Sequence, residues 1–178
     1  MRLKLLVLAF AIATLTLALV ATVALGDDRG RARAALIGYE ETPMTLSSSG
    51  HGEFRATIDD ANRTIAYSLT FGGLNTAAVA AHIHLGQRAT SGGVSAFLCG
   101  GGGQMACPPG GGTVTGTITP SNVIGPTAQG IAPGEWDELV AAMRAGFTYA
   151  NVHTTAFPSG EIRGQISTKG DRNGGNDD

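Results

Sequence analysis

The chain has 178 residues, with 12 basic and 14 acidic side chains and a formal net charge of −2. A chain of this length usually forms one domain with a sizeable hydrophobic core. The nearly balanced charge provides no basic stripe of the kind that binds nucleic acid, so we expect no nucleic-acid partner.

The N-terminal segment has the layout of a signal peptide. Arg2 and Lys4 precede an apolar run over residues 5–25, and small residues stand just before a charged start at Asp27. We therefore predict a signal peptide over residues 1–26 and an exported protein, periplasmic or extracellular. The alternative is an uncleaved membrane anchor, because the run approaches the roughly 20 residues that span a bilayer. That anchor would be the protein's only membrane contact.

Alternation of apolar and polar residues along the remaining chain predicts short β-strands. Residues 27–34, with regularly spaced arginines, are expected to form a flexible lead-in, and a first strand is expected over residues 36–42. Seven further strands are predicted where the same alternation returns between turn residues. Their ranges are 51–59, 64–71, 77–85, 94–98, 113–119, 147–154 and 161–166.

One segment departs from the strand pattern. Its apolar side chains recur at helical spacing, at Trp136, Leu139, Val140 and Met143. Acidic residues crowd the first turn, and Gly146 follows the last periodic residue, as is common at helix ends. We predict a short amphipathic helix that packs against the sheet, with Gly164 on the last strand marking the point of close approach.

Eight short strands and one helix predict a mainly β fold, either an antiparallel β-sandwich or a partly closed barrel with one short amphipathic helix. This domain is expected to span residues 35–168. The final segment, residues 169–178, contains only Gly, Asn and charged residues. Such a composition buries too little apolar surface to fold, so we expect a disordered tail.

Cys99 and Cys107 are the only cysteines in the chain. An exported protein meets an oxidising environment in which a lone pair of thiols usually closes. Four consecutive glycines over residues 100–103 give the backbone the freedom to bring the two cysteines together. We predict a disulfide. The alternatives are two free thiols or a metal thiolate.

The densest group of polar side chains lies in a predicted C-terminal hairpin. Alternation puts Tyr149, Asn151 and His153 on one face of its first strand. In its second strand the apolar residues point one way, and Glu161 and Arg163 point the other. If the apolar faces of both strands share the core, these five residues form one polar face.

The four histidines include an H-x-H pair, His82 and His84, on one strand face. Side chains two residues apart on a strand emerge about 6.8 Å apart at their Cα atoms, which lets two imidazoles converge on one ion. His153 is the candidate third ligand, and copper or zinc is the metal that suits imidazoles. The alternative is structural: the histidines only hydrogen-bond sheet edges together, and Arg163 pairs with Glu161 or another carboxylate.

Three segments, in chain order, resemble signatures of the chordin-domain (CHRD) family. They are Leu36–Pro43 near the start, Ala81–His84 in the middle, and Asn151–Ile166 at the C-terminal hairpin. The resemblance spans residues 35–168 and implies a secreted all-β domain, while it says little about molecular activity. The Gly-rich, Cys-flanked segment 99–112 makes the middle longer than the family's minimal pattern.

The sequence has no nucleophile elbow, no phosphate-binding loop and no Cys–His spacing typical of a catalytic dyad, so we expect no enzyme. The first hypothesis is an exported, non-catalytic binding or structural module that acts on an unknown protein or cell-surface partner through its polar face and loops. The second is a copper- or zinc-binding protein centred on His82, His84 and His153, with a redox role as one form of that class. No other cofactor is expected.

Overall fold

The computed structural model describes residues 30–168. The expected signal peptide, its membrane-anchor alternative and the expected C-terminal tail lie outside the described residues. Among the residues that are described, no helix is long and apolar enough to cross a membrane.

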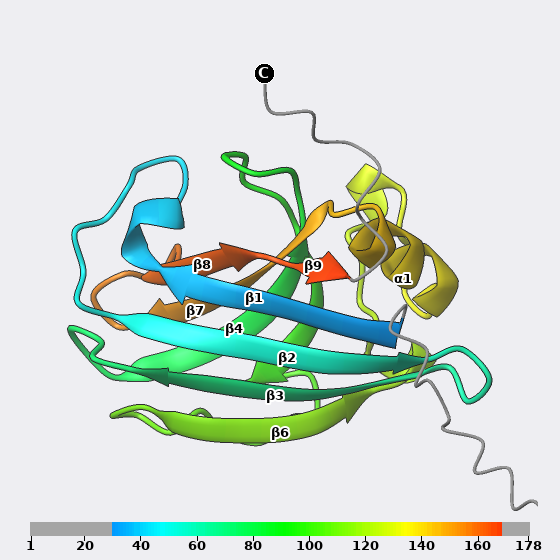
Figure 1. Ribbon diagram of the computed structural model, residues 1–178, viewed down its shortest axis with the longest axis horizontal. Coiled ribbons are helices and arrows are strands. Elements are labelled where there is room, and N and C mark those ends of the chain that lie inside the picture. The colour runs from blue at the N-terminus through cyan, green and yellow to red at the C-terminus, as the bar shows by residue number, and fades with distance from the viewer. Residues whose placement is uncertain (1–29, 169–178) are drawn as a thin grey trace, which may run out of the picture.

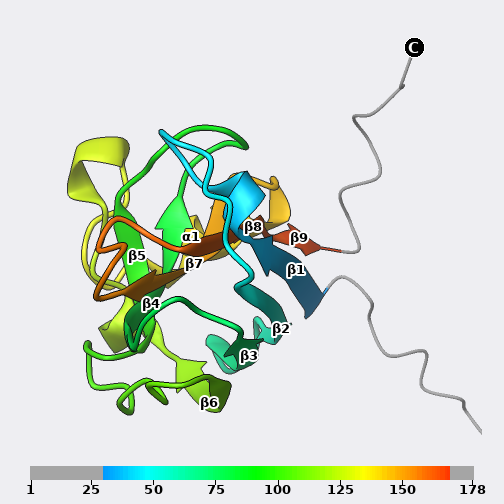
Figure 2. The same ribbon diagram turned by 90° about the vertical axis from the view of Figure 1, so that its left-hand side faces the viewer.

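Nine antiparallel strands form one continuous sheet in the described part of the chain. Their order is β5-β4-β7-β8-β1-β2-β3-β6, and β9 pairs with β1. The sheet curls into a nearly closed barrel (Figures 1 and 2), which confirms the predicted mainly β fold. The strands are β1 (Arg31–Ile37), β2 (His51–Asp59), β3 (Thr64–Gly72), β4 (Ala78–Leu85), β5 (Val94–Cys99), β6 (Gly112–Ile118), β7 (Thr148–Thr154), β8 (Ile162–Gln165) and β9 (Ser167–Thr168). Short 3-10 helices cover Gly38–Glu40, Pro120–Asn122 and Thr127–Gln129.

The first strand differs from its prediction. The sequence predicts a flexible lead-in over residues 27–34 and a strand over 36–42, whereas β1 begins at Arg31 and ends at Ile37. Alternate residues of β1 are buried, and its arginines point outward. The buried residues of β1 are Ala32, Ala34 and Leu36. Two of the three are alanines, whose small side chains give a weak apolar signal in the sequence. Pairing with β2 along the whole of β1 decides that this segment is a strand.

The predicted amphipathic helix is present as α1 (Trp136–Arg144), and all four of its predicted apolar residues are buried. Ion pairs hold it beside the turn between β2 and β3. Arg63 of this turn pairs with Asp137 at 2.7 Å. Arg144, in the last turn of the helix, pairs with Asp60 at 2.6 Å. The helix therefore covers one end of the barrel (Figure 1).

Gly164 of β8 does mark a close approach, but the approaching element is a strand. A Cβ atom at Gly164 would lie 2.1 Å from the carbonyl oxygen of Ala35 in β1. The sequence predicts approach by the helix, and this prediction is wrong because β1 pairs beside β8. Only the order of strands in the sheet decides which backbone passes there.

The two cysteines form the predicted disulfide. Cys99, at the end of β5, is bonded to Cys107, and their Cα atoms lie 5.0 Å apart. The described residues contain no free cysteine. Neither sulfur is therefore available as a metal thiolate.

All seven positions of β7 are buried, and this determines where the polar residues lie. Ala150 and Val152 belong to the barrel core. Tyr149, Asn151 and His153 alternate with these core residues and face the outside of the sheet. There, segment 38–50 supplies a hydrogen-bond partner to Asn151, and segment 86–93 supplies one to Tyr149. A second, polar layer thus lies between the sheet and these two covering segments.

Candidate metal centre

The three candidate ligands lie side by side on the outer face of two neighbouring strands. His82 and His84 are on β4, and His153 is on β7, which pairs antiparallel with β4. One ligand nitrogen from each histidine lies within 4.8 Å of the other two. The ring centroids are 4.7 to 5.6 Å apart. The structure therefore brings together the three histidines that the sequence singles out.

Backbone carbonyl groups hold two of the imidazoles. Nδ1 of His84 lies 3.0 Å from the carbonyl oxygen of Gly92. Nδ1 of His153 lies 2.9 Å from that of Pro158. Because a carbonyl oxygen only accepts, both Nδ1 atoms carry a hydrogen and each Nε2 presents a lone pair. Both Nε2 atoms, and Nδ1 of His82, are buried without a hydrogen-bond partner among the described residues. This pattern is typical of metal-ligating histidines.

Burial keeps the cluster uncharged. Loss of solvation is the main cause that lowers the pKa of His82 to about 3, and the charges of His153 and His84 act in the same direction. The pKa of His84 falls to about 4 for the same main reason, although its bond to Gly92 opposes the shift. Burial also lowers the pKa of His153. All three imidazoles are therefore neutral near pH 7, which is the form that binds a metal.

Aromatic rings pack against two of the histidines. The rings of Tyr149 and His84 are stacked, with centroids 4.8 Å apart and an interplanar angle of 5°. The Tyr149 hydroxyl accepts a hydrogen bond from the backbone N–H of Gly92 at 3.0 Å. The same glycine thus holds both the tyrosine and Nδ1 of His84. His82 meets Phe97 edge to face, at a centroid distance of 4.5 Å.

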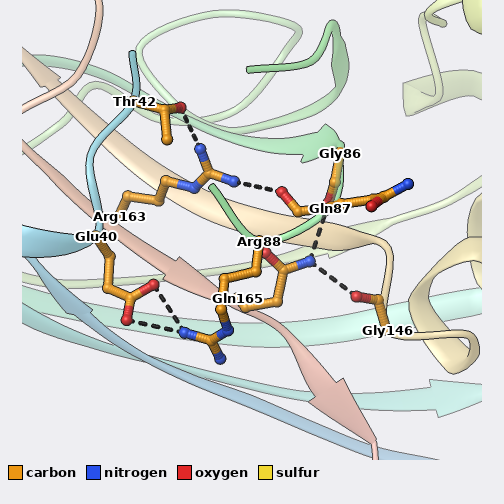
Figure 3. A network of polar contacts seen from close by, with 8 residues as sticks. All are labelled: Glu40, Thr42, Gly86, Gln87, Arg88, Gly146, Arg163 and Gln165. Carbon is orange, nitrogen blue, oxygen red and sulfur yellow. Dashed lines mark hydrogen bonds and ion pairs between the residues drawn. The ribbon is translucent and has the colours of Figure 1, made fainter. Parts of the chain in front are cut away.

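Arg163 lies over the Tyr149 ring and is only 1% exposed. Its Cζ atom is 3.6 Å from the ring centroid. The guanidinium donates to the hydroxyl of Thr42 and, at 2.9 Å, to the carbonyl of Gln87 (Figure 3). The structural alternative drawn from the sequence pairs Arg163 with Glu161 or another carboxylate, whereas both of these acceptors are neutral. They come from the covering segments, whose position strand alternation does not predict.

Glu161 is fully buried and serves a different set of donors. One of its carboxylate oxygens accepts from the Ser48 hydroxyl at 2.7 Å and from the backbone N–H of Asn75 at 2.8 Å. The other accepts from the Thr154 hydroxyl at 2.8 Å. Glu161 therefore ties β7 to two loops, which is a structural role.

Asn151 pairs with Glu41, a residue that no pattern in the sequence marks as functional. The side-chain nitrogen of Asn151 donates to the Glu41 carboxylate, with distances of 3.0 and 3.2 Å to its two oxygens. Burial raises the pKa of Glu41 to about 7, although the Asn151 bond and the charge of Arg163 oppose the shift. Oδ1 of Asn151 is buried without a partner among the described residues.

The predicted polar face is thus internal. Tyr149, Asn151, Glu161 and Arg163 are all buried beneath the covering segments. They form a network beside the histidines and not an exposed contact surface. Sequence reasoning also misses the carbonyl groups of Gly92 and Pro158, because a backbone acceptor carries no side-chain signal.

The cluster offers one site of three nitrogen ligands. Among residues 30–168, no carboxylate or thiolate joins the three imidazoles in one ligand group. The fourth histidine, His51, is exposed on β2, with its Nδ1 3.2 Å from the carbonyl oxygen of Ser49.

Comparison with known families gives one match. The sequence model of one protein family, described as CHRD domain, matches residues 32–166. This segment contains the three histidines and the disulfide. Neither the comparison with curated proteins nor that with solved structures found a match. The family match covers most of the chain, at nearly the bounds that the resemblance predicts, and this chain therefore belongs to the CHRD-domain family.

Proposed function

We propose that this chain is an exported, non-catalytic CHRD-domain module that binds one copper or zinc ion through His82, His84 and His153. The observation that carries the proposal is the set of buried ring nitrogens without partners among the described residues, one on each histidine of a single ligand group. Two of these nitrogens, Nε2 of His84 and Nε2 of His153, present lone pairs, and the hydrogen bonds from Nδ1 to backbone carbonyls hold the orientation of each ring.

A purely structural role fits these nitrogens poorly. A buried polar atom without a hydrogen-bond partner costs about 1–3 kcal/mol, and the cluster contains three of them. A metal ion that accepts the three lone pairs offsets this cost. Glu161 and Arg163 have hydrogen-bond partners and fit the alternative of a structural network. Each of the three histidines keeps one ring nitrogen without a partner among the described residues and fits that alternative less well.

The spacing of the nitrogens suits a small transition-metal ion. Two nitrogens bound to one zinc ion lie roughly 3.4 Å apart, given zinc–nitrogen bonds of about 2.0–2.1 Å in a tetrahedral site. Ligand atoms that already lie within 4.8 Å of one another need only small side-chain movements to reach this geometry. Imidazole suits copper as well as zinc, and intrinsic affinity favours copper(II).

Export is supported by the disulfide, the family match and the layout of the N-terminal sequence. A binding role toward a protein or cell-surface partner fits the covering segment 38–50 better than the buried polar face. Tyr39 and Met44 on this segment are 64% and 72% exposed. Exposed large apolar side chains are common at contact surfaces.

Calorimetric titration of metal-free protein with copper(II) and zinc near pH 7.5, about one unit above the ordinary histidine pKa, tests the site. We expect one ion per chain. His84→Ala and His153→Ala should each abolish stoichiometric binding, because each removes one of three ligands. His51→Ala is the matched control, because this histidine is exposed and lies outside the ligand group.

Circular dichroism of each variant shows whether the barrel is intact. Binding that persists in both cluster variants, or that disappears only with His51, would overturn the metal centre. Absence of stoichiometric binding in the unmodified chain would overturn it as well.

A further inference from the structure

A buried positive charge lies beside the metal centre, and we propose that it makes the site select Cu(I) over Cu(II), with Arg163 as the residue that sets the selection. This inference rests on the proposed function, because it names the oxidation state of the ion that the same histidines hold. Arg163 acts through the ring of Tyr149 and does not itself contact the metal site.

The charge is connected to the site by a rigid stack. The His84 ring lies on one side against Tyr149 at 4.8 Å, and the Arg163 guanidinium lies 3.6 Å from the same tyrosine ring. Both ends of the stack are anchored. Gly92 holds the tyrosine hydroxyl and Nδ1 of His84. Thr42 and the carbonyl of Gln87 hold the guanidinium (Figure 3).

The positive charge is only partly compensated. An arginine keeps its charge in proteins, and the hydroxyl and carbonyl that Arg163 bonds to are both neutral. Two acids, Glu41 and Glu40, act on the charge of Arg163. The Glu40 carboxylate pairs with Arg88 at 2.8 Å, and the positive charge of Arg88 opposes the effect of Glu40 (Figure 3). Glu41 lies in the covering segment 38–50, and Asn151 is its bonded partner.

The ligands do not offset the charge of the metal either. Three neutral imidazoles form the ligand group, and no carboxylate or thiolate among the described residues joins them. The repulsion between a bound ion and Arg163 is proportional to the charge of the ion. The cost of burying an ion rises still more steeply, with the square of its charge. Both effects penalise Cu(II), and zinc with the same charge, more than Cu(I).

Competition titrations of the full chain separate the two oxidation states. Cu(I) affinity is measured against bicinchoninate without oxygen and with ascorbate, and Cu(II) affinity against nitrilotriacetate without reductant. The unmodified chain should bind Cu(I) more tightly than Cu(II). Arg163→Gln should reduce this selectivity by about tenfold or more, because the repulsion in a buried stack is weakly screened.

Three variants keep this result separate from mere damage to the fold. Arg163→Lys keeps a unit positive charge at this position although it loses the planar stack, and it should keep the selectivity within about threefold because the repulsion depends on charge. Arg55→Gln removes an arginine of β2 whose side chain is 71% exposed and pairs with Glu53, so solvent screens the charge and the selectivity should not change. Glu41→Gln removes the opposing charge and should raise the selectivity, and it carries the test if Arg163→Gln does not fold.

The outcomes distinguish this inference from the proposed function. If the unmodified chain binds none of Cu(I), Cu(II) and zinc, the metal centre itself is overturned. Binding of Cu(II) at least as tight as that of Cu(I) overturns the selection and leaves the metal centre standing. Selectivity that does not change in Arg163→Gln, or in Glu41→Gln if the first variant is unfolded, overturns the role of Arg163.

Discussion

The imidazole rings of His82 and His153 lie 4.7 Å apart, although one residue is on β4 and the other on β7. The pairing of these two strands brings them together on the outer face of the sheet, where Phe97 packs against His82 and the carbonyl of Pro158 holds His153. Two neighbouring imidazoles each disfavour a positive charge on the other, and burial disfavours it further. The three imidazoles therefore stay neutral down to a lower pH than ordinary histidines do. Because a metal binds the neutral imidazole, this burial sets the pH range of metal binding.

Metal binding should persist well below the ordinary histidine pKa of about 6.5. The sequence alone predicts loss below that value, whereas burial lowers the pKa of His84 to about 4 and that of His82 to about 3. Protons therefore compete weakly between pH 7.5 and about 5.5. We expect the copper(II) affinity to change by less than about tenfold across this range in calorimetric titrations. A fall of about a thousandfold, as three ordinary imidazoles would give, would contradict the burial of the cluster.

Glu41→Gln should stabilise the metal-free fold at alkaline pH. The folded-state pKa of Glu41 is raised to about 7, so its stabilising contribution is complete below about pH 4.5 and is lost as the pH rises through 7. A glutamine carries no charge and provides a donor toward the unpartnered Oδ1 of Asn151. We expect a gain of about 2 kcal/mol at pH 8 and little change at pH 5, measured by urea unfolding. Glu40→Gln, on the exposed neighbour, should show no such pH-dependent gain.

Gly164→Ala should destabilise the barrel strongly. The new Cβ atom would lie 2.1 Å from the carbonyl oxygen of Ala35, and a strand backbone cannot move aside without loss of pairing. Overpacking of this kind costs about 1–3 kcal/mol or more. The control is Gly110→Ala, where a Cβ atom meets nothing within 4 Å. Equal melting temperatures for the two variants would show that β1 does not approach β8 as described.

Glu161→Gln should cost about 3 kcal/mol of unfolding free energy. The carboxylate accepts hydrogen bonds from Ser48, Asn75 and Thr154. In glutamine, an NH2 group replaces one of the two oxygens, so at least one of these three donors would lose its acceptor. Urea unfolding measures the loss. Glu138→Gln on the exposed face of α1 should leave stability within about 0.5 kcal/mol. Similar values for both variants would mean that Glu161 is solvated in solution.

Removal of the disulfide should cost about 2–3 kcal/mol, because the bond closes a short loop. The double variant Cys99→Ser/Cys107→Ser should match the reduced wild-type chain in chemical unfolding. Mass analysis after alkylation, without reductant, checks that the bond is present in protein collected from its native compartment. Two alkylated thiols in that sample would refute the disulfide.

Much of the architecture is determined by the sequence alone. Side chains alternate across a strand and recur every three to four residues on a helix, and these periods depend only on local backbone geometry. They correctly place His82 and His84 on one face, and they predict the amphipathic helix. Cys99 and Cys107 are predictable because two cysteines allow a single intramolecular pairing.

Other features depend on which segments meet after folding. Alternation places Arg163 and Glu161 on one face, but most of their partners come from loops distant in the sequence, and the two do not pair. Glu41 becomes a buried acid only because its segment folds over β7. Likewise, Gly164 faces Ala35 through strand order and not through any local pattern. The tertiary structure alone decides these contacts, because burial, hydrogen-bond partners and charge at a position are set by neighbours whose distance along the chain leaves no periodic signal.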